Sequence, residues 1–192
     1  MGIEFELKYR ATEAQQEALL ARFGSGQTIA METTYYDTPD RQLADRHITL
    51  RRRMENGSSV CTVKTPAGSA GRGEWDCLCE DIRAAVPELC KLGAPEYILL
   101  LTAQGLEPTC GARFTRRAVY IETEGFNAEL AIDSGSLLGS GREAPLCEVE
   151  LELKSGDPKA MIAFMEQIAA QYGLIPEPHS KFRRAKALAE GA

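Results

Sequence analysis

Ile3-Glu4-Phe5-Glu6-Leu7-Lys8-Tyr9-Arg10 stands at the start of the chain and alternates apolar with charged residues. In an extended strand, successive side chains point to opposite faces, so the apolar residues share one face and the charged residues share the other. The pattern predicts a β-strand with one buried face and one densely charged face. Alone, it is typical of a half-exposed strand whose polar face meets water.

A second acidic strand and a basic hairpin repeat this pattern. Glu148-Val149-Glu150-Leu151-Glu152-Leu153-Lys154 alternates as strictly as the first stretch. Residues 48–55 and 58–64 flank Asn56-Gly57, the strongest short signal for a two-residue hairpin loop. That loop fixes the register, which places Arg53 opposite Val60 and Arg51 opposite Thr62. The hairpin therefore has one apolar face and one basic face.

The remaining segments predict further strands and several helices. Thr12 is a candidate cap for a helix that ends at Gly24, and Asp157-Pro158 opens an amphipathic helix to about Tyr172. Residues 82–105 read as a helix in two pieces, and residues 180–189 as a basic helical tail. Further strands are expected at residues 28–37, 73–80, 113–122 and 126–133, with a short strand or turn at 134–141.

Composition limits the class of protein. The 192 residues carry a net charge of −6, which argues against a general nucleic-acid binder. No apolar run reaches the roughly 20 residues of a membrane span, and the N-terminal strand pattern is unlike a signal peptide. Six cysteines form no CxxC pair, so we expect reduced thiols and a cytoplasmic protein without membrane partners.

Two architectures account for the alternating strands. In a β-sandwich, the apolar faces pack together and the charged faces meet water. In a closed barrel, helices cover apolar faces on the outside, and the charged faces line the lumen. The barrel better explains why acids and bases lie on separate strands. The sequence therefore favours an α+β fold with a closed antiparallel barrel and helices packed outside.

The charged faces supply the groups that metal-assisted phosphate chemistry needs. Paired carboxylates are hard oxygen ligands that suit Mg²⁺ or Mn²⁺, and converging Arg and Lys side chains suit a polyphosphate. Together they favour phosphoryl or nucleotidyl transfer. The acids are Glu4, Glu6, Glu148, Glu150 and Glu152, with Glu74, Asp76, Glu129 and Asp133 as further candidates. The bases are Lys8, Arg10, Arg51, Arg53 and Lys64, with Arg72, Arg116 and Lys181 as further candidates.

An ordered set of short motifs resembles the CYTH family of triphosphate tunnel metalloenzymes. The motifs are Glu4-x-Glu6-x-Lys8, Tyr36-Asp37-Thr38, Leu50-Arg51-x-Arg53, Thr62-Val63-Lys64 and Glu148-x-Glu150-x-Glu152. The chain looks most like the CYTH part of bacterial inorganic triphosphatases. The resemblance implies an eight-stranded antiparallel tunnel that forms one domain over residues 1–192, without the CHAD domain that some relatives carry.

The resemblance also implies roles for individual residues. The catalytic residues would be Glu4, Glu6, Lys8 and Lys64. The metal ligands would be Glu4, Glu6, Asp133, Glu148, Glu150 and Glu152, of which Glu150 is favoured on its strand. The triphosphate would be bound by Lys8, Arg51, Arg53, Lys64, Arg116 and Lys181. Arg117 shares a face with Val119 and Ile121, which favours Arg116 as the inward residue of that pair.

The expected activity is metal-dependent hydrolysis of inorganic triphosphate to pyrophosphate and phosphate. Two alternatives stay open: another triphosphate in the same tunnel, through adenylate cyclase or thiamine or nucleoside triphosphatase activity, and a non-catalytic polyphosphate- or nucleotide-binding module. Few aromatic residues are expected in the lumen to hold a base, because Tyr9 and Trp75 fall on apolar faces. The expected partner is a small-molecule triphosphate rather than nucleic acid, and a homodimer remains open.

Overall fold

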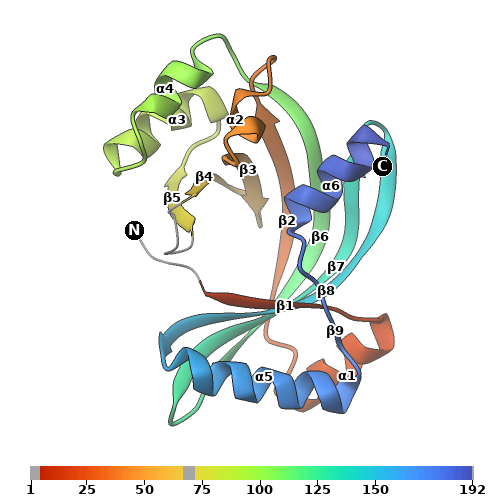
Figure 1. Cartoon of the computed structure of the whole chain (residues 1–192). Coiled ribbons are helices and arrows are strands. Elements are labelled where there is room, and N and C mark those ends of the chain that lie inside the picture. Colours follow the sequence, from red (N-terminus) through yellow and green to blue (C-terminus); the bar gives the residue numbers. More distant parts are fainter. Residues whose placement is uncertain (1–4, 67–71, 192) are drawn as a thin grey trace.

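The computed structural model describes residues 5–66 and 72–191, which form one curved antiparallel sheet with helices on both faces (Figure 1). The sheet order is β5-β4-β3-β2-β6-β7-β8-β1-β9. The strands are β1 Glu6–Arg10, β2 Gln27–Asp37, β3 Thr49–Glu55, β4 Ser58–Pro66, β5 Arg72–Leu78, β6 Glu107–Glu122, β7 Phe126–Gly139, β8 Arg142–Gly156 and β9 Ile175–Pro176. The helices are α1 Glu13–Phe23, α2 Gln42–Asp45, α3 Ile82–Lys91, α4 Tyr97–Thr102, α5 Pro158–Tyr172 and α6 Lys181–Glu190.

The β3–β4 hairpin forms with the predicted register. Arg53 pairs with Val60 and Arg51 with Thr62. Asn56 and Gly57 both have positive φ, at 49° and 90°, which a tight two-residue loop of this hand requires. Because side chains alternate along each strand, this register directs the basic residues of the hairpin to one face of the sheet.

The long strands at the centre of the sheet differ from the expected boundaries. Residues 134–139 continue β7 rather than forming a separate strand or turn, and β8 begins at Arg142. Gly135 allows this continuation, since a Cβ there would lie 2.2 Å from the backbone oxygen of Arg113 on β6. The predicted first strand is described from Glu6 onward, and residues 1–4 lie outside the described part of the chain.

A large antiparallel sheet is confirmed, but the described residues do not show the predicted closure into eight strands. Nine strands are present in the described ranges, because Ile175–Pro176 adds a short strand beside β1. Within residues 5–66 and 72–191, the edge strands β5 and β9 are not hydrogen-bonded to each other. The described part of the sheet is curved like a trough, with a concave and a convex face (Figure 1).

Two apolar cores lie on the convex face, as the alternating patterns predict. Helices α1 and α5 cover one core, where Tyr9, Leu151 and Met165 pack together. Helices α2, α3 and α4 cover the other, which contains Leu50, Val63 and Trp75. Tyr9 and Trp75 thus lie outside the trough, as expected. Among the described helices, none is long and apolar enough to span a membrane.

The C-terminal helix α6 corrects the prediction that the helices pack outside. Phe182, Ala185 and Leu188 pack against Phe114 and Leu137, which share the concave face with the charged residues. The helix begins at Ser180, whose hydroxyl accepts a hydrogen bond from the backbone N–H of Arg183 at 3.2 Å. Helix α6 is amphipathic, with an apolar stripe along one side. Such a stripe does not specify which face of a sheet the helix will cover.

Candidate functional site

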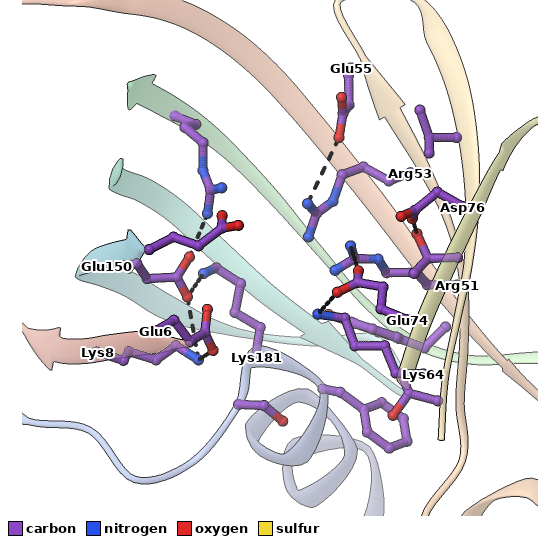
Figure 2. Close-up of a pocket in the computed structure, with 18 residues that line it drawn as sticks. Glu6, Lys8, Arg51, Arg53, Glu55, Lys64, Glu74, Asp76, Glu150 and Lys181 are labelled. Atoms are coloured by element: carbon purple, nitrogen blue, oxygen red, sulfur yellow. Dashed lines mark hydrogen bonds and ion pairs between the residues drawn. The ribbon is translucent and has the colours of Figure 1, made fainter. Parts of the chain in front are cut away.

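The concave face holds a polar cavity of about 460 Å³ between two walls of charged side chains (Figure 2). One wall comes from β1 and β8 and the other from β3, β4 and β5, with Arg116 on β6 and Lys181 on α6 beside the first wall. The predicted residues that line the cavity are Glu6, Lys8, Arg51, Arg53, Lys64, Glu74, Asp76, Arg116, Glu150, Glu152 and Lys181. Charged faces from both walls therefore line one shared cavity.

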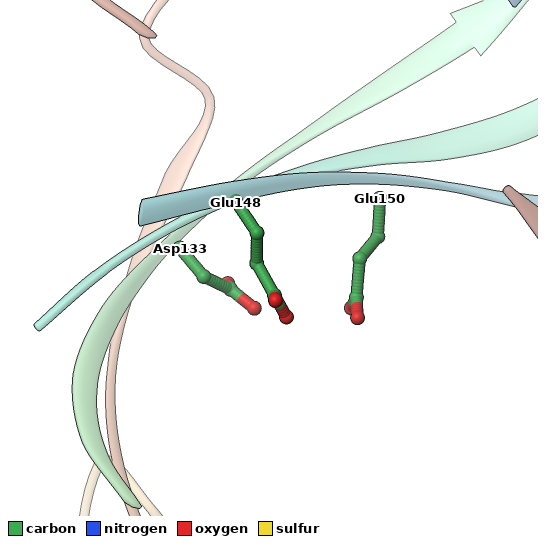
Figure 3. Close-up of side chains that lie close together, drawn as sticks. All are labelled: Asp133, Glu148 and Glu150. Carbon is green, nitrogen blue, oxygen red and sulfur yellow. The ribbon is translucent and has the colours of Figure 1, made fainter. Parts of the chain in front are cut away.

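Three carboxylates converge at the end of the first wall (Figure 3). Asp133 on β7 and Glu148 and Glu150 on β8 each offer an oxygen within 4.8 Å of the other two. Asp133 and Glu148 are fully buried, and Glu150 is 8% exposed. Strand pairing brings them together, since Asp133 lies directly opposite Glu148 and Glu150 follows two residues later on the same face.

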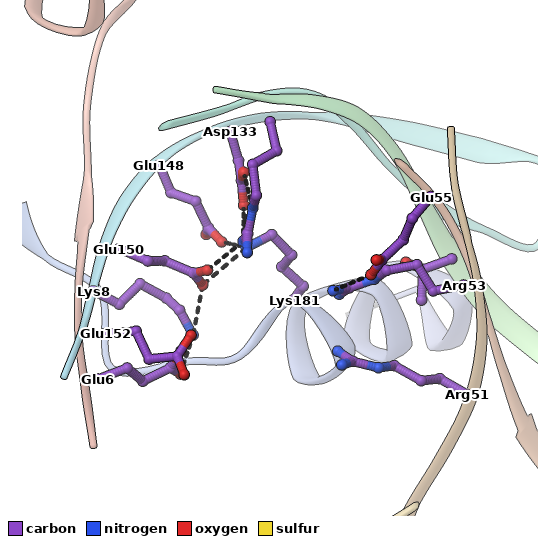
Figure 4. Close-up of polar contacts among 12 residues, drawn as sticks. Glu6, Lys8, Arg51, Arg53, Glu55, Asp133, Glu148, Glu150, Glu152 and Lys181 are labelled. Carbon is purple, nitrogen blue, oxygen red and sulfur yellow. Dashed lines mark hydrogen bonds and ion pairs between the residues drawn. The ribbon is translucent and has the colours of Figure 1, made fainter. Parts of the chain in front are cut away.

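Basic side chains fill the space between these acids (Figure 4). Arg116 donates to both oxygens of Asp133, at 2.8 and 2.7 Å, and to Glu150 at 2.6 Å. Lys181 Nζ lies 2.8 Å from Asp133 and 2.9 Å from Glu150, and it also contacts Glu148. Arg116 is thus the inward residue of its pair, as predicted. The contacts of Arg116 and those of Lys181 with Glu148 and Glu150 are charge-assisted hydrogen bonds, and the contact between Lys181 and Asp133 is an ion pair.

Burial and neighbouring charges have opposing effects on the pKa values of Glu148, Glu150 and Lys8. Burial raises the pKa of Glu148, although Lys181 partly offsets that effect. Burial would also raise the pKa of Glu150, but Lys181 and Arg116 hold it well below its ordinary value. Burial would lower the pKa of Lys8, yet Glu150 and Glu6, whose carboxylates lie 3.3 and 3.1 Å away, raise it. The cluster is therefore a compact set of fixed opposite charges.

Arg53 on the second wall lacks comparable compensation. It is 8% exposed, its Nε donates to the hydroxyl of Thr33 at 3.0 Å, and among the described residues the carboxylate that pairs with it, Glu55, is 3.8 Å away. Burial and the neighbouring Arg51 lower the pKa of Arg53 to about 10. A buried cation is costly unless an anion pairs with it. This wall is therefore prepared to receive negative charge.

Glu74 links two other bases of the second wall. Its carboxylate lies 2.9 Å from Lys64 Nζ and 3.5 Å from Arg51, whose Nε is buried without a hydrogen-bond partner in the described part of the chain. Nearby, the hydroxyl of Thr62 donates to Asp76 at 2.5 Å. Glu74 and Asp76 therefore lie on the basic wall and not with the other acids.

A second row of acids lies at the more exposed end of the first wall. Glu152 pairs in register with Glu129 on one side and with Glu6 on the other. Like charges directly opposite one another destabilise a sheet, so this row favours a bound cation. Lys154 contacts Glu152 at 2.8 Å. Glu4, the other predicted ligand on this strand, lies outside the described residues, and the side chain of Arg72 is likewise not described.

The structure adds site residues that the sequence patterns did not identify. Phe182 on α6 packs against Tyr35, with ring centroids 5.0 Å apart, and both line the cavity. Arg184 contacts both Glu148 and Glu177. Lys181 and Arg184 are three residues apart, so both reach one side of the helix. That spacing is the only sequence signal for Arg184, and it becomes informative only once α6 is placed on the concave face.

The donor chemistry of the first wall fits a hard divalent cation. All three carboxylates of the buried cluster offer oxygen only, and Glu150 also borders the cavity with Glu6 and Glu152. Mg²⁺ and Mn²⁺ prefer such oxygen ligands. The two rows of carboxylates could therefore hold metal at the first wall, opposite the bases of the second.

Comparisons with known proteins identify the relatives of this chain. Residues 2–185 match the CYTH domain. An inorganic triphosphatase from Haemophilus influenzae is 28% identical over 162 residues, which make up 82% of this chain and 46% of that protein. The chain thus spans about half the length of this curated relative.

Solved structures share the fold at low sequence identity. A candidate adenylyl cyclase from Hippeastrum, described as having a dominant triphosphatase activity, superposes with a TM-score of 0.68 at 17% identity, covering 98% of this chain and 95% of that one. The protein PH1819 from Pyrococcus horikoshii gives a TM-score of 0.63 at 22% identity, covering 98% and 99%. With the family match extending over nearly the whole sequence, the chain belongs to the CYTH domain family.

Proposed function

We propose that this protein hydrolyses inorganic triphosphate to pyrophosphate and phosphate with Mg²⁺ or Mn²⁺. The observation that carries the proposal is the undercompensated Arg53, which faces a row of carboxylates across a cavity of about 460 Å³. A triphosphate chelated to a divalent cation carries both charges that this cavity lacks: anionic oxygens for the basic wall and a cation for the acidic wall.

The residues of the chain have separable roles in this reaction. Arg51, Arg53 and Lys64 bind the phosphate oxygens from the second wall, and Lys8 and Arg116 approach them from the first. Glu6, Glu150 and Glu152 would hold the metal where it borders the cavity, together with Glu4. A bound metal supplies charge neutralisation and a water of lowered pKa. The side chains contribute orientation and preorganised charge, which dominate catalysis of phosphoryl transfer.

The aromatic pair at the cavity supports inorganic triphosphate over ATP. Tyr35 is 3% exposed, because Phe182 covers its ring. A nucleobase would have to displace Phe182 to stack there, whereas a bare triphosphate needs only charged contacts. The haemophilus relative is named an inorganic triphosphatase, which supports the same substrate.

A substrate panel tests the proposal. Tripolyphosphate, ATP and thiamine triphosphate are incubated with Mg²⁺ or Mn²⁺, and released phosphate and cyclic AMP are measured separately. We expect the highest kcat/KM for tripolyphosphate and loss of turnover in excess chelator. A higher kcat/KM for ATP, or substantial cyclic AMP, would assign the site to nucleotides, and turnover that survives chelation would reject the metal-dependent reaction.

A further inference from the structure

Phe114 on β6 lies on the concave face next to cations from both sides of the cavity. The centroid of its ring is 5.9 Å from the guanidinium carbon of Arg53, 6.0 Å from that of Arg116 and 5.3 Å from Lys181 Nζ. These distances are within the range of cation–π interactions. Phe114 itself is buried, at 4% exposed. One ring therefore lies close to basic side chains that three separate elements, β3, β6 and α6, bring to the cavity.

Strand pairing directs Arg53 toward this ring. Arg53 pairs with Thr33 on β2, and Thr33 pairs with Ala112 on β6, so the three residues form one row across three strands. Phe114 follows two residues after Ala112 and shares the concave face with it. Because the side chain of Ala112 is only a methyl group, the long side chain of Arg53 can cross this row and reach the ring.

The ring matters most for Arg53, because carboxylates already hold the other two cations. Arg116 and Lys181 are both paired with buried carboxylates of the first wall. Arg53 instead has the hydroxyl of Thr33 at 3.0 Å and the carboxylate of Glu55 at 3.8 Å. A guanidinium is attracted to an aromatic face, and the attraction is stronger where water is excluded.

An aromatic ring differs from a carboxylate in what it leaves available to a ligand. A carboxylate would hold Arg53 by cancelling its charge, and a phosphate would then have to displace that carboxylate. The face of a ring attracts a cation through its quadrupole and carries no net charge. Contact with Phe114 can therefore hold Arg53 in place while its full positive charge stays available to an anion.

We propose that Phe114 is the positioning residue of Arg53, whose guanidinium it holds in the cavity in the orientation that binds phosphate oxygens. The neighbouring cations repel Arg53, and without the ring it would also populate orientations turned away from them. The affinity for a polyphosphate would then fall with the fraction of molecules in which Arg53 is correctly placed. This inference rests on the proposed function, since it gives Phe114 a part in binding the same substrate.

Phe114 also belongs to an apolar core with Leu137 and Ala185, and a purely packing role gives different expectations. Fluorination keeps the ring close to its original shape and makes it more apolar, but it progressively removes the negative charge of the ring face. Packing would therefore persist along a series of mono-, di- and trifluorinated phenylalanine. A cation–π contact would weaken at each step.

The first experiment places this series at position 114 and measures tripolyphosphate binding by calorimetric titration in excess chelator. We expect the affinity to fall at each step, and by at least about threefold with the trifluorinated ring. The same series at Phe126 is the matched control, because Phe126 is also 4% exposed but packs against Phe164 on the convex face. It should leave the affinity unchanged. An affinity that stays constant or rises along the Phe114 series would overturn the proposal.

A double-mutant cycle tests whether the ring acts through Arg53. In the Arg53→Met background, fluorination of Phe114 should have little further effect on tripolyphosphate affinity. A loss as large as that in the wild-type background would mean that the ring supports the cavity in another way, and the proposal fails.

Chemical denaturation without ligand separates this inference from the proposed function. The trifluorinated ring should lower the free energy of unfolding when Arg53 is present, because a buried cation then loses a partner, but not in Arg53→Met. If this coupling is absent from a protein that binds tripolyphosphate, the role of Phe114 alone is rejected. If the coupling is present but the wild type neither binds nor hydrolyses tripolyphosphate, the proposed substrate and the binding role of Phe114 are rejected, and only the contact with Arg53 stands.

Discussion

At the scale of single residues, we expect buried Arg53 to lower the stability of the ligand-free protein and to increase its affinity for tripolyphosphate. Arg53→Met removes a buried cation whose partner at hydrogen-bond distance, among the residues that the structure describes, is the neutral hydroxyl of Thr33. We expect tripolyphosphate affinity to fall at least about tenfold, because a charge-assisted phosphate contact contributes roughly 1.5–3 kcal/mol. The free energy of unfolding without ligand should not fall. Calorimetric titration and chemical denaturation check the two parts.

Arg52→Met is the matched control for this prediction. Arg52 lies next to Arg53 on β3 but points to the other face, where it donates to the backbone oxygen of Glu80. It should leave tripolyphosphate affinity unchanged. Equal losses in both variants would mean that general charge, and not the concave face, sets the affinity.

The lowered pKa of Glu150 predicts how the stability of the protein depends on pH. Its pKa is held well below the ordinary 4.5, so the folded state releases this proton more readily than the unfolded state does. Its stabilising contribution is therefore present above pH 4.5 and disappears as the pH falls through the folded value. Glu150→Gln should cost about 3–5 kcal/mol near pH 7, since it leaves buried cations unpaired. The difference from wild type should shrink below pH 4.5, which denaturation at several pH values will show.

The outcome at Glu150 also separates two explanations for the cluster. A pH-independent loss in Glu150→Gln would point to altered packing instead of lost charge. Glu32→Gln offers a comparison, because Glu32 is exposed and contacts Arg113 only at 3.7 Å. That substitution should change stability by less than about 1 kcal/mol at any pH.

At the scale of secondary structure, the β3–β4 hairpin depends on its loop. Gly57 has a φ of 90°, and a Cβ there would meet open space, so Gly57→Ala tests backbone strain alone. We expect a loss of about 1–2 kcal/mol in the free energy of unfolding. Ser58→Ala, at the exposed next residue, should have little effect. If Gly57→Ala is equally harmless, the loop does not constrain the register of Arg51 and Arg53.

The strand faces were predictable from sequence, whereas the placement of α6 was not. Alternation along β1, β3 and β8 correctly predicted which side chains share the concave face, because a strand has only two faces. The hairpin register followed from Asn56-Gly57 for the same reason. Helix α6 has an apolar stripe, but either face of the sheet could receive it. Its cavity-lining residue Phe182 and its acid-binding residue Arg184 were therefore missed.

At the scale of the whole molecule, ligand binding should join the two walls of the trough. Tripolyphosphate with Mg²⁺ would contact β1 and β8 on one side and β3 and β4 on the other. We expect the melting temperature to rise, with a stabilisation of about 2.7 kcal/mol when the ligand is at 100 times its dissociation constant. Differential scanning calorimetry measures this. Orthophosphate with Mg²⁺ is the control, since one phosphate cannot span the cavity.

An equal stabilisation by orthophosphate would argue that the walls bind anions independently.

Closure of the sheet was the other whole-molecule feature that sequence reasoning addressed. Alternation within a strand specifies faces but not which edges meet, so pairing between β5 and the β1–β9 edge could not be derived from it. The extent of the antiparallel sheet was predictable, but its topology at the edges was not.

The order of strands has a consequence for the synthesis of the protein. The basic wall is built from neighbouring segments, since β3, β4 and β5 pair successively. The acidic wall joins β1 to β8, so Lys8 meets Glu150 only after most of the chain has been made. Because a nascent chain emerges N-terminus first, the basic β3–β4 hairpin can form on the ribosome long before the carboxylates assemble. In a stalled nascent chain that ends near residue 110, the amides of β3 and β4 should therefore already be protected from hydrogen exchange. The amides of β1 should exchange freely, because its partner β8 has not yet been translated.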